Sequence, residues 1–92
     1  MPAAARMFDL TNHPGLILGG SPTVFIDKLP AARFGDTHVC LMPPLAGPHP
    51  SNPIVAGSGT VYINGMLAAR QLDPCGCGAS ITTGSATVLI GG

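Results

Sequence analysis

The chain has 92 residues, which is enough for one small domain. Charged residues make up only 9% of it, and its four Lys and Arg residues balance its four acidic residues. This composition excludes the basic surface that nucleic acid or an anionic membrane would require. No apolar stretch approaches the ~18 residues of a membrane span. We therefore expect neither nucleic-acid binding nor stable membrane insertion.

Large apolar side chains are scarce, with no Trp, one Tyr and three Phe. A domain of this size usually needs a covalent or metal staple. The N-terminal residues lack the features of a signal peptide, so we expect synthesis in the cytoplasm, where disulfides rarely persist. Three cysteines and three histidines make a metal the favoured staple.

Two motifs recur three times along the chain, which indicates three copies of one unit within a single domain, residues 1–92. Gly-Ser-x-Thr-Val-x-Ile begins at Gly20, Gly57 and Gly84, and Ala-Arg-x-x-Asp begins at Ala5, Ala32 and Ala69. The distance from Arg to Ser is 15, 25 and 15 residues in the three copies, so the second copy carries a ten-residue insertion.

Each unit is predicted to be β structure. The β-branched runs 23–26, 60–63 and 87–90 are typical of strands, and Asp27-Lys28 and Asn64-Gly65 follow the first two as hairpin turns. Second short strands are predicted at 16–18, 54–55 and 80–82. Units this short need one another for a core, which favours a closed pseudo-threefold arrangement over a linear array.

The histidines and cysteines fall at equivalent positions of the three units. Seven residues after each Arg stand His13, Cys40 and Cys77, and five residues after it stand Thr11, His38 and Cys75. His49 lies in the insertion, between two prolines. Three imidazoles and one thiolate would suit a closed zinc site of structural type. The competing interpretation makes the cysteines small buried apolar residues and the histidines ordinary loop residues.

The Arg and Asp of each copy account for six of the eight formal charges. We interpret them as ion pairs that hold equivalent turns. No serine lies in a nucleophile-elbow motif, no Gly-rich loop leads into a helix, and all four acidic residues are Asp. The sequence therefore predicts a protein that is not an enzyme.

Pro30-Ala31-Ala32-Arg33, with the degenerate copies ending at Arg6 and Arg70, resembles the motif of the PAAR-repeat family. That resemblance implies a small β-rich cone with pseudo-threefold symmetry and a metal near its point. It also implies that the broad base sits on a trimeric VgrG-like β-helical spike. The chain would then be the spike tip of a type VI secretion system or related contractile injection system, aiding membrane piercing and effector delivery.

The resemblance also assigns a zinc ligand set of His13, His38, His49 and Cys77. Cys75 is the competing thiolate, Cys40 is expected to be a buried bystander, and iron is the alternative metal. The first and third copies depart from the motif, because Phe8 and Leu72 stand where the second copy has Gly35.

With five residues before the first repeat and none after Gly92, we expect no fused toxin domain. An effector would then be a non-covalent partner. We expect delivery outside the cell, or into a target cell, by the injection apparatus. The alternative function is a free-standing zinc-binding or zinc-delivery module, which should have an open coordination position.

Overall fold

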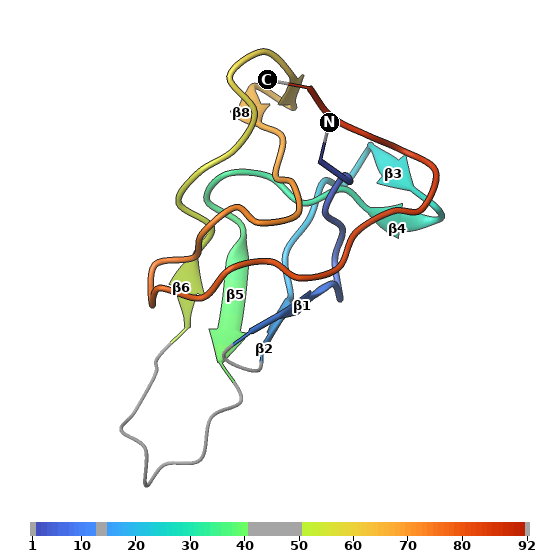
Figure 1. Ribbon diagram of the computed structural model, residues 1–92. Coiled ribbons are helices and arrows are strands. Elements are labelled where there is room, and N and C mark those ends of the chain that lie inside the picture. The colour runs from blue at the N-terminus through green and yellow to red at the C-terminus, as the bar shows by residue number, and fades with distance from the viewer. Residues whose placement is uncertain (1, 13–14, 41–50, 92) are drawn as a thin grey trace, which may run out of the picture.

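The computed structural model describes residues 2–12, 15–40 and 51–91, and these form only short β elements (Figure 1). One antiparallel sheet has the strand order β1-β2-β5-β6, formed by Leu10–Thr11, Gly15–Ile17, Thr37–Cys40 and Asn52–Pro53. Two hairpins pair β3 (Phe25–Ile26) with β4 (Leu29–Pro30) and β7 (Tyr62–Ile63) with β8 (Met66–Leu67). The prediction of a mainly β domain is confirmed. Within the described ranges, no helix is long and apolar enough to cross a membrane.

Both predicted hairpin turns form. The φ angles of Asp27 and Lys28 are 53° and 69°, and those of Asn64 and Gly65 are 53° and 79°. Two successive positive φ values are the signature of the tight turn that matches the twist of a two-stranded hairpin. The two turns are therefore equivalent in geometry although they share no residue type.

The third repeat also makes a hairpin, but its return strand comes from the N-terminus. Ala3 forms an antiparallel bridge with Leu89, and the amide of Ile90 donates to the carbonyl of Pro2 at 2.9 Å. Equivalent pairs join Phe25 to Pro30 and Tyr62 to Leu67 in the first two hairpins. Figure 1 accordingly shows the two ends of the chain close together, at the end of the molecule that also carries β3, β4 and β8.

A ring of backbone hydrogen bonds closes the three repeats on one another. The amide of Ala5 donates to the carbonyl of Ala69, Ala69 donates to Ala32, and Ala32 donates to Ala5, each at 3.0 Å. A linear array would leave its first and last units unpaired. The repeats are instead arranged around a common axis, as the motif spacing predicts.

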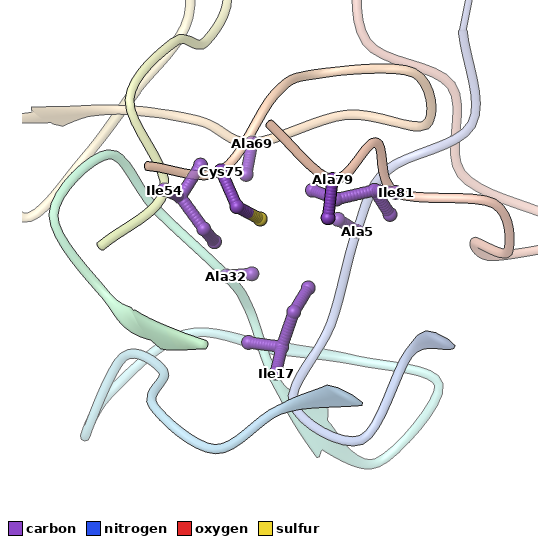
Figure 2. Close-up of a cluster of buried hydrophobic side chains, with 8 residues drawn as sticks. All are labelled: Ala5, Ile17, Ala32, Ile54, Ala69, Cys75, Ala79 and Ile81. Carbon is purple, nitrogen blue, oxygen red and sulfur yellow. The ribbon is translucent and has the colours of Figure 1, made fainter. Parts of the chain in front are cut away.

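The core consists of two layers of small and β-branched side chains. One layer contains three alanines and three isoleucines from equivalent positions, together with two residues of the third repeat (Figure 2): Ala5, Ala32, Ala69, Ile17, Ile54, Ile81, Cys75 and Ala79. The second layer repeats this composition with Ala4, Ala31, Ala68, Ile26, Ile63 and Ile90. Alanines near the axis bring the three backbones close together, so this core needs no large aromatic side chain.

Candidate functional site

The Arg–Asp pairs hold three equivalent turns. In the second repeat, Asp36 accepts hydrogen bonds from the backbone amide of Arg33 at 2.7 Å and from its guanidinium nitrogens at 3.0 and 2.9 Å. Arg6 with Asp9 and Arg70 with Asp73 repeat this pattern. Hydrogen bonding to Asp36 raises the pKa of Arg33. Each Asp is buried and occupied by its turn, which supports an architectural role.

The residue before each of these Asp residues has a positive φ: 74° at Phe8, 89° at Gly35 and 78° at Leu72. Only glycine adopts this conformation without a steric penalty. The first and third repeats thus keep the turn although they lack the glycine of the motif. The backbone ring and the Arg–Asp pair specify the turn more strongly than the local residue does.

His38 and Cys77 lie together at the end of the molecule opposite the hairpins. The Nδ1 atom of His38 is 3.9 Å from the Sγ atom of Cys77. The other ring nitrogen, Nε2, is hydrogen-bonded to Thr11 Oγ1 at 2.7 Å. Asn52 Oδ1 lies 3.2 Å from His38 Nδ1 and accepts the amide of Cys77 at 3.3 Å. His38 and Thr11 are buried and Asn52 and Cys77 are half-buried, and together the four residues join all three repeats.

Two of the four predicted ligands, His13 and His49, lie outside the described residues, as does the side chain of Cys40. Cys75 lies in the core beside Ile54 (Figure 2). Across residues 2–12, 15–40 and 51–91, no group of three or more His, Cys, Asp or Glu residues could hold a metal ion. The assignment of His13, His38, His49 and Cys77 therefore stays a prediction.

The described pair nevertheless fits a shared metal. Zinc bonds of about 2.0 Å to nitrogen and about 2.3 Å to sulfur, at a tetrahedral angle, place the two ligand atoms roughly 3.5 Å apart. The observed separation of 3.9 Å is close to this value. In the tautomer that carries its proton on Nε2, His38 donates a hydrogen bond to the Thr11 hydroxyl, the support that a histidine ligand usually has. The equivalence of Thr11 with His38 pointed to this contact, whereas no sequence signal identified Asn52.

The hairpin end of the molecule carries a second candidate site, which we call the base. Its outer residues are Phe25, Tyr62 and Leu89, equivalent by repeat and 58%, 60% and 55% exposed. Val24, Val61 and Val88 precede them and are each 36% exposed. The base thus presents two sets of three exposed apolar side chains. An exposed apolar surface of this kind marks an interaction site more often than a free surface.

These features define a small β module of three repeats closed around an axis, with an apolar base at one end and a histidine–cysteine pair at the other. The PAAR motif model matches residues 9–83, most of the chain. The chain belongs to the PAAR family.

Relatives of known activity share this module. The chain is 42% identical over 82 residues to the NAD(P)(+) glycohydrolase toxin Tse6 of Pseudomonas aeruginosa PAO1. The matched segment covers 85% of this chain and 19% of the toxin. It is 42% identical over 82 residues to the (p)ppApp synthetase toxin Tas1 of P. aeruginosa UCBPP-PA14, with the same coverage. It is 38% identical over 81 residues to the double-stranded DNA deaminase toxin A of Burkholderia cenocepacia H111, covering 87% of this chain and 5% of that toxin.

The chain thus spans less than a fifth of the length of each of these relatives. Their names state three unrelated activities, yet all three proteins share the segment matched here. The shared segment is a structural module, and the chemistry of those toxins lies outside it.

Proposed function

We propose that the chain is the tip that caps a trimeric VgrG-like β-helical spike of a type VI secretion or related contractile injection system. The observation that carries the proposal is the base. A single chain presents the same kind of exposed side chain three times, at Phe25, Tyr62 and Leu89, around the axis on which its repeats close. A trimeric partner would meet one such side chain with each of its subunits.

The opposite end is then the point of a small cone. We propose that His13, His38, His49 and Cys77 hold one zinc ion there, which the spacing of His38 and Cys77 supports. The metal would supply rigidity, because the free energy of metal binding becomes folding free energy, on the order of 10 kcal/mol in zinc peptides. A rigid tip suits membrane piercing and delivery of effectors by the apparatus, with an effector as a further, non-covalent partner.

Binding to a trimeric VgrG-like spike protein from the same genome tests the proposal. We expect one chain per trimer by size-exclusion chromatography with light scattering. Tyr62→Asp places a charge in the base and should weaken binding at least about tenfold. Leu72→Asp is the matched control, since Leu72 is 73% exposed and lies in an Arg–Asp turn instead of the base. Absence of a complex, or equal weakening by both variants, would overturn the proposal.

The His38–Cys77 pair also favours a second candidate, a free-standing module that buffers or delivers zinc. Such a module releases its metal with the fold intact. A chelator at neutral pH should distinguish the two, because removal of a structural zinc unfolds the chain. Loss of metal without any change in the circular dichroism spectrum would favour delivery.

A further inference from the structure

Three serines lie beneath the base, and no sequence motif assigned them a function. Ser21, Ser58 and Ser85 are almost completely buried. Each hydroxyl accepts the backbone amides two and three residues further on, so it organises its own loop. For Ser21 these donors are Thr23, at 3.1 Å, and Val24, at 2.8 Å. The other two serines repeat both bonds within 0.2 Å: Thr60 and Val61 to Ser58, and Thr87 and Val88 to Ser85.

The glycine before each serine permits this arrangement. A Cβ atom on Gly20 would lie 2.6 Å from the Cβ of Pro30, and the corresponding distance from Gly57 to Leu67 is 2.8 Å. Contacts this short do not occur, so only glycine lets the loop pack against the return strand. The Gly-Ser pair therefore brings the serine hydroxyl under the base, within reach of the neighbouring repeat.

Each hydroxyl then donates a hydrogen bond to the corner of the next repeat, where a corner is the residue that directly follows the Thr-Val-x-Ile run. Ser21 donates to the side chain of Asn64, Ser58 donates to the carbonyl of Gly91 at 2.7 Å, and Ser85 donates to the carboxylate of Asp27 at 2.5 Å. The links run from repeat 1 to 2, from 2 to 3 and from 3 to 1. They form a closed ring with one direction.

Further polar contacts reinforce two of the corners. Asn64 Nδ2 donates to Thr23 Oγ1 at 2.9 Å, back into the loop of Ser21. At the first corner, Asp27 also accepts Thr87 Oγ1 at 2.8 Å and Arg6 Nη1 at 3.0 Å. The acceptor at the three corners is an amide, a carboxylate or a backbone carbonyl, while the position of the serine is constant. The geometry of the link is preserved although its chemistry differs.

We propose that Ser21, Ser58 and Ser85 are positioning residues of the base, each of which fixes the corner of the following repeat relative to its own loop. Phe25 and Tyr62 each stand two residues before a corner, so the ring sets the spacing of the side chains that face the partner. A base that is fixed before binding loses less conformational entropy on docking. The consequence for docking rests on the proposed function, whereas the coupling between corners does not.

Hydrogen exchange of individual amides tests the coupling. Asn64→Ala removes the acceptor of Ser21 at an exposed position, so the fold should survive. We expect exchange of the Thr23 and Val24 amides, some 40 residues away in sequence, to rise by a few-fold to about tenfold, the effect of one lost hydrogen bond. Asn64→Asp retains the acceptor, as Asp27 does at the first corner, and should keep the wild-type rates. A rise confined to repeat 2, or equal rises at all three corners, would overturn the proposal.

The serine itself supplies the second test. Ser21→Ala should speed exchange in its own loop and at Gly65 while leaving the loop of Ser85 unchanged. Ser80→Ala is the control, a serine outside the ring. Ser21→Ala should also weaken binding to a VgrG-like trimer by about tenfold although the apolar base residues remain. If the wild-type chain binds no such trimer, the proposed function is wrong. The exchange rates still show whether the serines couple the corners of neighbouring repeats.

Discussion

Joining Gly92 to Pro2 should stabilise the fold, because Ile90 and Pro2 already pair as the two strands of a hairpin do. The Ile90 amide donates to Pro2 as one strand of a hairpin donates to the other, and Gly91-Gly92 supplies the two residues that a tight turn needs. A Gly-Gly pair adopts two positive φ values without strain. The perturbation is an amide bond from Gly92 to Pro2, with Met1 removed.

The expected gain follows from the length of the closed loop. Closing a loop of about 90 residues restricts the unfolded chain and is worth at most on the order of 4 to 5 kcal/mol at 25 °C. Strain at the new turn would subtract from this value. A gain of roughly 3 kcal/mol should raise the unfolding temperature of a domain this size by roughly 12 °C or more.

Guanidinium unfolding of the cyclic and linear chains, with equal metal content, measures the gain. The control is a permuted linear chain that contains the Gly92–Pro2 bond but begins at Gly65 and ends at Asn64. It moves the break to a corner with the same geometry, so its stability should match that of the original chain. A cyclic chain no more stable than the linear one, or an unfolded permutant, would refute the equivalence of the three corners.

Two further predictions concern the thiols and acid stability. Cys77→Ser should lower the zinc content of untagged protein, measured by elemental analysis, well below one ion per chain. Cys75→Ser should lower the unfolding temperature and leave the zinc content unchanged. Equal loss of zinc in the two variants would make Cys75 a ligand. Hydrogen bonds from Ser85 and Thr87, with the charge of Arg6, hold the pKa of Asp27 below its usual 3.8. The stabilising effect of the ionised Asp27 side chain is complete above pH 3.8, and it is lost as the pH falls through the lower pKa of the folded state. Asp27→Asn, which copies the second corner, should make the melting temperature depend less on pH below about pH 4. The same pH dependence in the variant and in the wild-type chain would contradict this.

The repeat spacing predicted much of the fold. The threefold recurrence of two motifs, at separations of 15, 25 and 15 residues, indicated three units around an axis, and the turn residues located both hairpins. The third hairpin was not predicted, because its strands at Ala3 and Leu89 are separated by nearly the whole chain and are brought together only when the ring closes. The backbone preferences of Phe and Leu also did not predict the positive φ at Phe8 and Leu72, because tertiary contacts override those preferences there.

The register of ligand-type residues indicated only that the loops carrying them converge, and the resemblance to the PAAR-repeat family named His38 and Cys77 as ligands; in the structure these two side chains lie 3.9 Å apart. It could not indicate which ring nitrogen faces the sulfur. That orientation depends on Thr11 and Asn52, which contact opposite edges of the imidazole. Such residues carry no metal-binding pattern of their own, so only the folded arrangement reveals them.

The three repeats carry similar residues at the base and different residues at the opposite end of the molecule. This difference matches the functions that we propose for the two ends. At the base, the three repeats keep the same kind of side chain, as a surface that faces three identical subunits requires. At the opposite end, the equivalent positions hold Thr11, His38 and Cys75, three residue types with different tasks. A zinc ion held on an axis of three repeats would need four ligands, and three equal contributions could not supply them. The ten-residue insertion carries His49, which is the fourth ligand in the set that we propose.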